Sequence, residues 1–388
     1  MHKKCIKNAY KINFYKIIKN NSIKMKTKIS LFSLVLAIFF IPLIKAEDEP
    51  TADHVRAAYN AYVAKFKKSG HPKGFALVNI DGFWQSAETT EVFIDAYERF
   101  QDVASKEQMI EVVESWLKSQ GEDWKWNAYN DDIMWATIML TRTYLHTKTE
   151  KYLTIAKKNF QTVWDRAWTD QYEGGLVWCE EEDKTSKNAC VNGPGAIAAC
   201  FLAIATGDDS YYDKADAMVQ WLNKMLVQDD GGVWDCIDWD SKNNKYTYNT
   251  WVSTYNQGTY IGACKMLYEH NHKSEYLEMA KKAAKRATKI DAILDGEDNG
   301  GDLIGFKGIL ARWLGKLIRD LKINTYNEWT TNNAHSAWVN RNSDNIMWTK
   351  FGTKTEDNIE KSSQDNKRTQ TAWGCSAPLS WLINLAAL

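Results

Sequence analysis

Proline is scarce in this chain of 388 residues, with five in all, and runs of alternating apolar and polar residues are scarce too. Because proline interrupts helices, its scarcity is consistent with a largely helical protein. Seven histidines are present, and neither they nor the cysteines have the spacing of metal ligands, so we expect no metal site. The chain has no Gly-x-Ser-x-Gly motif of the kind that marks an esterase nucleophile.

Acidic residues are absent from residues 1–46, which contain ten lysines. Residues 47–388 carry 39 basic and 49 acidic side chains, a net charge of −10, and lack the basic surface that nucleic acids require. From Met25, a second plausible start, a basic segment leads into an apolar run over residues 29–44 and then Ala46. This pattern predicts a basic leader and secretory signal peptide over residues 1–46, with an uncleaved anchor as the alternative. We therefore expect a secreted or cell-surface protein with no stable membrane insertion after cleavage.

Six cysteines follow the predicted signal peptide. Cys179 and Cys190 flank a polar loop and are the candidate disulfide in an oxidising compartment. Cys200 and Cys264 lie on apolar helical faces, which favours free, buried thiols.

Aromatic residues are abundant, with eighteen tryptophans and eighteen tyrosines. Core packing explains many of them, but a flat apolar ring with one polar edge also suits the C–H face of a sugar. Six tryptophans fall at predicted loop–helix junctions, and we expect about half of them to line a cleft. These six are Trp84, Trp126, Trp135, Trp178, Trp234 and Trp239.

Apolar residues recur with the helical period along most of the chain. The pattern predicts helices over 52–68, 85–100, 105–120, 131–147, 149–165, 194–206, 209–227, 256–270, 274–290, 304–321, 325–340 and 369–387.

An internal repeat of about 60 residues groups these helices into hairpins. Asp132 precedes Tyr152 by 20 residues, and Asn256 precedes Tyr276 by the same interval. Six hairpins arranged around an axis bury both faces of each unit, with apolar helices inside and amphipathic helices outside. We therefore predict an all-α protein, an (α/α)6 toroid of six helical hairpins, forming one catalytic domain over residues 47–388. An open superhelix of helical pairs is the alternative.

Polar residues open the predicted inner helices at equivalent positions. Asp131 and Asp132 are adjacent in the segment YNDDIMW, and the equivalent segments contain Asn192, Asn256 and Gln257. Helix capping explains one aspartate, but not a pair among converging amides. Paired carboxylates are what glycoside hydrolysis requires, one ionised and one protonated. The sequence therefore predicts a glycosidase site at one end of the toroid.

Five ordered motifs between Phe83 and Leu321 resemble glycoside hydrolase family 76: YNDDIMWATIMLTRTY, GGLVW, NGPGAIAACFLAIATGDDSYY, TYNQGTYIGACKMLYE and FKGILARWLGKL. The resemblance implies an (α/α)6 fold and a retaining endo-α-1,6-mannanase that needs no metal or other cofactor. It implies Asp131 as nucleophile and Asp132 as acid/base, with the motif from Tyr255 to Gly258 at the mannose site. The substrate-binding residues that we expect are Trp84, Gln85, Tyr129, Asn130, Asn192, Asp235, Tyr255, Asn256 and Gln257.

The expected partner is therefore an α-1,6-mannan, bound by a secreted monomer. Two alternatives remain at this point. One is a transglycosidase of the same family, which transfers the sugar to a hydroxyl group of cell-wall or glycolipid-linked mannan. The other is a mannan-binding protein without catalysis, which would have no need for both aspartates.

Overall fold

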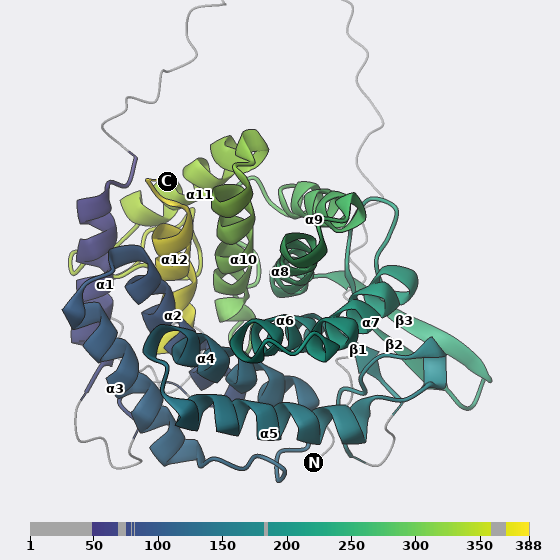
Figure 1. The fold of residues 1–388 in the computed structure, drawn as a ribbon. Helices are drawn as coiled ribbons and strands as arrows, with labels where there is room; N and C mark the ends of the chain where they lie inside the picture. Colours follow the sequence, from purple (N-terminus) through teal and green to yellow (C-terminus); the bar gives the residue numbers. More distant parts are fainter. Residues whose placement is uncertain are drawn as a thin grey trace, which may run out of the picture. The chain divides into compact units, whose positions relative to one another are not determined.

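The computed structural model describes residues 49–68, 75–78, 80, 82–181, 185–357 and 370–387, so the predicted leader and signal peptide lie outside the described residues. Twelve α-helices follow one another in this part of the chain (Figure 1). They are α1 Ala52–Phe66, α2 Phe83–Phe100, α3 Val103–Gln120, α4 Asn130–Thr147, α5 Glu150–Ala167, α6 Ala189–Thr206, α7 Ser210–Met225, α8 Thr254–Asn271, α9 Ser274–Ala287, α10 Phe306–Leu321, α11 Asn327–Val339 and α12 Ala372–Leu385.

The even-numbered helices form the inner layer, and each packs against the next from α2 to α12. Helix α12 also packs against α2, which closes the ring and excludes the open superhelix. Inner helix α6 is buried on almost every side, whereas outer helix α9 buries one stripe that includes Tyr276, Ala280 and Ala284. This difference is what an inner and an outer layer require. The fold is the predicted (α/α)6 toroid.

The repeated tyrosines tie neighbouring outer helices together. The Tyr152 hydroxyl on α5 donates to Glu114 of α3 at 2.7 Å. The Tyr276 hydroxyl on α9 donates in the same way to Asp216 of α7. The repeat seen in the sequence therefore has a structural cause, because each copy must dock onto the one before it.

A β-hairpin interrupts the helical pattern between α7 and α8, where the sequence predicts only a long loop. Strands β2 (Trp234–Asp240) and β3 (Lys245–Val252) pair in antiparallel fashion, and the short β1 (Lys187–Asn188) adds to β2. In Figure 1 the hairpin projects from the ring beside α7. The strand propensity of its tryptophans and tyrosines, together with cross-strand aromatic pairs, outweighs its aspartates.

Helix α6 begins at Ala189, five residues before the predicted start. The prediction placed Pro194 at the first helical position, where proline is favoured. Pro194 instead lies inside the helix and leaves the Cys190 carbonyl without its usual partner. Among the described residues, α6 is also the one helix long and apolar enough to cross a membrane, but it is buried as a core helix of the ring.

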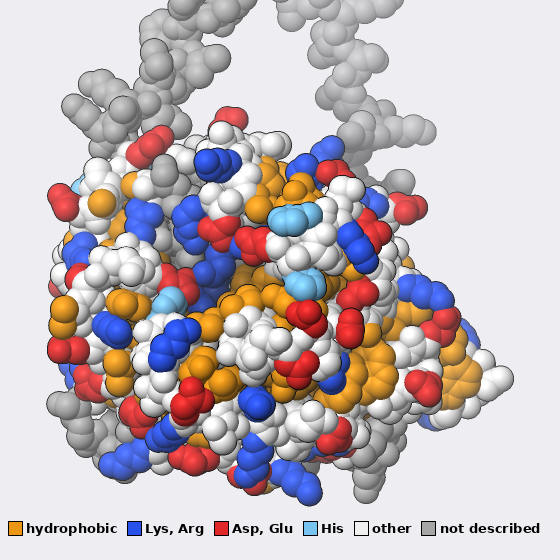
Figure 2. All heavy atoms as spheres, in the orientation of Figure 1, with side chains coloured by type: hydrophobic (Ala, Val, Ile, Leu, Met, Phe, Trp, Pro, Cys, Tyr) orange, Lys and Arg blue, Asp and Glu red, His pale blue; other side chains and the backbone are white. Residues whose placement is uncertain are grey.

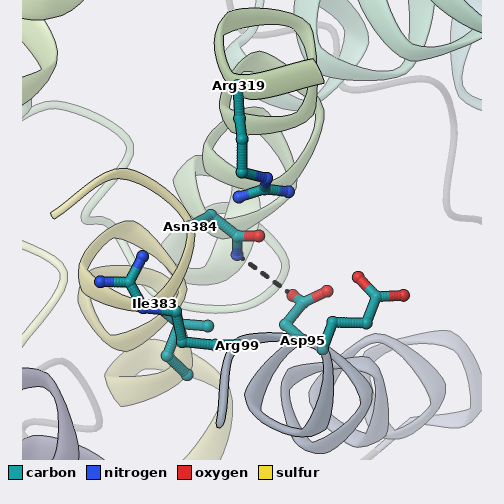
Figure 3. Close-up of a pocket in the computed structure, with 6 residues that line it drawn as sticks. Asp95, Arg99, Arg319, Ile383 and Asn384 are labelled. Carbon is teal, nitrogen blue, oxygen red and sulfur yellow. Dashed lines mark hydrogen bonds between the residues drawn. The ribbon is translucent and has the colours of Figure 1, made fainter. Parts of the chain in front are cut away.

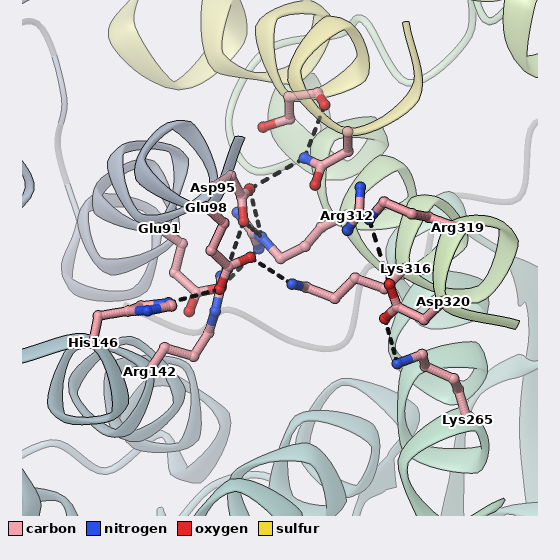
Figure 4. A network of polar contacts seen from close by, with 12 residues as sticks. Glu91, Asp95, Glu98, Arg142, His146, Lys265, Arg312, Lys316, Arg319 and Asp320 are labelled. Carbon is pink, nitrogen blue, oxygen red and sulfur yellow. Dashed lines mark hydrogen bonds and ion pairs between the residues drawn. The ribbon is translucent and has the colours of Figure 1, made fainter. Parts of the chain in front are cut away.

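Buried ion pairs join the inner helices α2, α4 and α10, toward the C-terminal ends of these helices (Figure 4). Arg312 of α10 contacts Glu88 at 2.6 Å and Asp95 at 2.8 Å, both on α2. Arg142 of α4 contacts Asp95 at 2.7 Å and Glu91 at 3.2 Å. Burial, opposed by Arg312, raises the pKa of Glu88 to about 7. Burial also disfavours the ionised form of Asp95, but the two arginines outweigh it and lower the pKa of Asp95.

A cavity of about 320 Å³ opens at this same end of the ring (Figure 3). Figure 2 shows basic and acidic side chains around a hollow in the face that it displays. The carboxylates in the cavity wall are held by ion pairs, Asp95 with Arg312 and Glu98 with Lys316 at 2.6 Å. The cavity is lined by Asp95, Glu98, Arg99, Arg319, Ile383 and Asn384.

Replacing Arg312 by methionine is expected to lower the free energy of unfolding by about 3–5 kcal/mol, because Glu88 and Asp95 would stay buried with fewer partners. Urea unfolding followed by circular dichroism measures this change. Lys281→Met is the control, since it removes an ion pair with Glu278 between exposed side chains and should cost less than about 1 kcal/mol. Equal unfolding midpoints for the two variants would contradict the prediction.

Candidate active site

The first turns of several inner helices meet at the end of the ring opposite the ion pairs. The Trp84 ring on α2 lies 5.9 Å from Trp135 of α4, 6.1 Å from Phe306 of α10 and 5.0 Å from Trp373 of α12. Helix N-termini present unpaired backbone N–H groups, so this end favours negative charge. Asp131 lies here, in the first turn of α4, next to Asp132.

Neither aspartate caps its helix. The N-cap residue of α4 is Tyr129, which makes no side-chain capping hydrogen bond. By contrast, Asp102 caps α3 through a hydrogen bond from the Ser105 backbone N–H at 2.8 Å. Helix capping therefore explains neither Asp131 nor Asp132.

Asp131 has a buried carboxylate oxygen. The Trp178 indole and the Cys190 thiol hydrogen-bond to it, while its Oδ1 atom is buried with no hydrogen-bond partner among the described residues. Burial, followed by the charge of Asp132, raises the pKa of Asp131 well above its ordinary value. Asp131 therefore keeps its proton at pH values where an ordinary carboxyl group has lost it.

Asp132 is held from the loop that precedes α4. Its Oδ2 atom accepts a hydrogen bond from the Asn127 amide at 2.9 Å, and Asn127 Oδ1 accepts from the Tyr129 backbone N–H at 2.9 Å. Arg166 of α5 donates to the Asn127 carbonyl at 2.7 Å. Asp132 is thus fixed at the start of α4 by the loop before that helix, which Arg166 of α5 holds in turn.

The predicted disulfide between Cys179 and Cys190 is wrong, because both thiols are free. Cys179 lies in an extended segment that bridges to Tyr129. Cys190 lies inside the first turn of α6, where its buried thiol hydrogen-bonds to Asp131 and accepts from the Tyr255 hydroxyl. The thiol therefore belongs to the carboxylate site, whereas Cys200 and Cys264 are buried in the core as expected.

A third carboxylate, Asp235, joins this cluster from strand β2. It accepts hydrogen bonds from the Asn249 amide at 2.8 Å and from the Asn256 amide at 3.2 Å. Burial raises the pKa of Asp235 to about 6. The charges of Asp131 and Asp235 both act on the Cys190 thiol, so both carboxylates lie near it. Within the described part of the chain, Asn256 Oδ1 is buried and has no hydrogen-bond partner.

Three predicted substrate-binding residues make hydrogen bonds to backbone groups of neighbouring loops. Asn192 Oδ1 accepts from the Leu176 backbone N–H at 2.8 Å, and Gln257 Oε1 accepts from that of Val233 at 2.6 Å. Asn130 is likewise fully buried, and its amide donates to the Val177 carbonyl at 2.9 Å. These three amides hold the loops that lead into and out of the inner helices.

The predicted aromatic residues differ in burial and in the side chains that surround them. The Tyr129 and Trp178 rings lie 5.3 Å apart beside Asp131, and Gln85 donates to Asp302 at 2.6 Å at the exposed rim. Trp84 is half-buried in the aromatic cluster described above, whereas Trp135 is fully buried. Trp126 is 65% exposed, and Trp234 and Trp239 lie on β2 against tyrosines of β3.

Two residues of the site are missing from the sequence prediction. They are Cys190, which contacts Asp131, and Asn249, which donates to Asp235. Cys190 directly precedes the segment VNGPGAI, which opens an inner helix, and this position could have indicated that Cys190 lies near the site. Asn249 belongs to the hairpin, which the prediction treats as a loop. Among the described residues, no group of three or more His, Cys, Asp or Glu side chains is placed to hold a metal ion.

An (α/α)6 toroid with paired carboxylates and aromatic rings at one end defines the class of the protein, a glycoside hydrolase. A model of glycosyl hydrolase family 76 matches residues 46–376, and the chain belongs to that family.

Two curated relatives carry the name mannan endo-1,6-alpha-mannosidase DCW1. The protein from Saccharomyces cerevisiae is 26% identical over 204 residues, which are 48% of this chain and 45% of that protein. The protein from Candida albicans is 26% identical over 207 residues, 48% of this chain and 46% of that protein. The chain thus spans about half the length of the curated relatives that it matches.

The fold is also similar to solved structures. One is an inactive variant of an alpha-1,6-mannanase of Salegentibacter sp. HEL1_6, with two consecutive aspartates replaced by asparagine, in complex with alpha-1,6-mannotriose. That match has a TM-score of 0.73 and 26% identity, and covers 86% of this chain and 98% of the other. Dfg5 from Chaetomium thermophilum matches with a TM-score of 0.69 over 86% of this chain and 90% of its own, at 14% identity, and so supports the fold alone.

Proposed function

We propose that this protein is an endo-acting hydrolase of α-1,6-linked mannan that works by a retaining mechanism, with Asp131 as nucleophile and Asp132 as acid/base. The observation that carries the proposal is the pair itself: two adjacent carboxylates in the first turn of α4 that cap nothing. A glycosidase needs one ionised and one protonated carboxyl group, and a coupled pair provides both.

The surroundings of Asp131 act on its ionisation in two opposite directions. Trp178 and Cys190 hydrogen-bond to Asp131, and such contacts orient a carboxylate and favour its charged form. Burial and Asp132 act in the opposite direction, so Asp131 loses its proton only above the ordinary carboxyl range. Asp132 is held by Asn127 at the start of the helix, in position to exchange a proton with the glycosidic oxygen.

In the first step of the proposed reaction, an Asp131 oxygen attacks the anomeric carbon as the glycosidic C–O bond breaks, and Asp132 gives its proton to the leaving oxygen. In the second step, Asp132 takes a proton from water, and the water oxygen displaces Asp131 from the same carbon. Two inversions return the α-configuration. We assign Asp235, Asn256 and Tyr255 to sugar binding, because their mutual contacts and the contact of Tyr255 with Cys190 bring them close to Asp131.

The names of similar proteins support the substrate class. A relative bound to alpha-1,6-mannotriose is inactive when two consecutive aspartates are replaced, and Asp131–Asp132 is such a pair. We extend the proposal to an exported monomer with its catalytic domain over residues 47–388, since residues 1–46 have the pattern of a leader and signal peptide. The N-terminal sequence and the native mass of the exported protein test these two points.

Incubation of the purified protein with unbranched α-1,6-mannan tests the activity. Hydrolysis should yield short oligosaccharides that accumulate with time, while the average chain length falls early because cleavage is internal. Elongated or transferred products would identify a transglycosidase instead. Binding without any change in chain length would indicate a mannan-binding protein and overturn the proposal.

A further inference from the structure

Core packing does not explain Trp251 of strand β3, which is 40% exposed. Its ring centroid lies 6.1 Å from that of Phe306, with the planes at 36°. Phe306 is buried and stacks on Tyr255 at 3.9 Å and 21°. The Tyr255 hydroxyl donates to Cys190, whose thiol contacts Asp131. A chain of side-chain contacts therefore leads from Asp131 to an exposed indole ring.

The backbone of Trp251 is tied to the third carboxylate as well. Asn249 Oδ1 accepts a hydrogen bond from the Trp251 N–H at 3.2 Å, while the amide nitrogen of Asn249 donates to Asp235 at 2.8 Å. The strand register shifts at this point of the hairpin, between Trp234 and Cys236. Register irregularities of this kind often redirect a side chain next to an active site. A single amide therefore fixes Trp251 relative to Asp235.

We propose that Trp251 is a substrate-binding residue whose exposed ring stacks on the C–H face of a hexose in the mannan chain, at a subsite beside Asp235. The proposal rests on the proposed function. A flat indole face takes up the apolar side of a sugar ring and leaves its hydroxyl groups free for water or polar side chains. Asn249 holds the backbone of Trp251, so the strand segment that carries the indole is already ordered before the sugar binds.

Tyr246, another exposed aromatic residue on strand β3, lacks this connection. Tyr246 is 48% exposed, but it pairs with Trp239 and Tyr172 on the projecting part of the hairpin. Figure 2 shows hydrophobic side chains over the projection that Figure 1 assigns to β2 and β3. Tyr246 therefore provides a matched control, an exposed ring on the same strand without a link to Asp131 or Asp235.

Binding is measured by titration calorimetry with α-1,6-mannotetraose, in a catalytically inactive background that carries Asp131→Asn and Asp132→Asn. Trp251→Ala should raise Kd about tenfold, since stacking would be lost. Trp251→Phe keeps a flat ring and should stay within about threefold of the parent. Trp251→Leu keeps apolar volume without a flat face and should resemble the alanine variant. Tyr246→Ala should leave Kd unchanged.

An unchanged Kd in Trp251→Ala, or parent-like binding by Trp251→Leu, overturns the proposal. Circular dichroism and thermal unfolding verify that each variant is folded. Because binding is measured without turnover, the result is separate from the proposed function, which fails if the unmutated protein leaves mannan intact. In the active protein, Trp251→Ala should raise KM for mannan.

Discussion

Replacing Asp131 by asparagine is expected to lower kcat on α-1,6-mannan by about 10⁴-fold or more, with little loss of stability. An amide has nearly the same shape as a carboxyl group, so Trp178 and Cys190 keep a partner. It cannot form the glycosyl-enzyme, and both chemical steps fail. Initial rates on mannan measure the change.

Asn127→Ala is the control for this variant, because it removes a contact to Asp132 and leaves both carboxyl groups in place. We expect a loss of about 10–100-fold from poorer positioning of Asp132, well short of the loss in Asp131→Asn. An aspartate that merely stabilised the helix would behave differently. Its removal would cost about 0.5–2 kcal/mol of folding free energy and leave turnover near the parent value, which would refute the assigned role.

The ring was predictable because its signals are local and repeated. Buried residues recur with the helical period on outer helices such as α9. Tyr152 and Tyr276 occupy equivalent positions in two copies of the helical hairpin. The β-hairpin of β2 and β3 was not predictable in the same way. Its strands are seven and eight residues long and rich in aspartate and asparagine, so their pairing depends on aromatic contacts across the sheet.

For the site, the sequence located the converging helix ends but not the direction of each side chain. Asn256 and Gln257 are neighbours, yet Asn256 contacts Asp235 while Gln257 holds the Val233 backbone. Successive side chains on a helix point about 100° apart, so one faces the site and the next faces a loop. The rotation of the helix about its own axis decides which of the two side chains faces the site, and packing against other helices sets that rotation. The same limit applies to Cys190, whose contact with Asp131 depends on how α6 lies against α4.

Replacing Asp132 by alanine is expected to separate the two chemical roles. Turnover of mannan should fall by about 10²–10⁴-fold, because the leaving sugar oxygen needs a proton. An aryl mannoside carries a leaving group that needs little protonation, so the variant should retain a much larger share of its activity on that substrate. Parallel rate measurements on the two substrates test this difference. Equal losses on both would remove Asp132 from the acid/base role.

Azide added to Asp132→Ala tests the double displacement. It should attack the glycosyl-enzyme on the face normally taken by water and give an α-mannosyl azide. A β-azide would exclude the double displacement.

The effect of Asp132 on the ionisation of Asp131 is tested by a pH profile. The charge of Asp132 raises the pKa of Asp131, so Asp132→Asn should lower that pKa and move the acid limb of kcat/KM on the aryl substrate to lower pH. An unmoved limb would mean that Asp131 does not control it, since removal of a neighbouring negative charge can only ease ionisation.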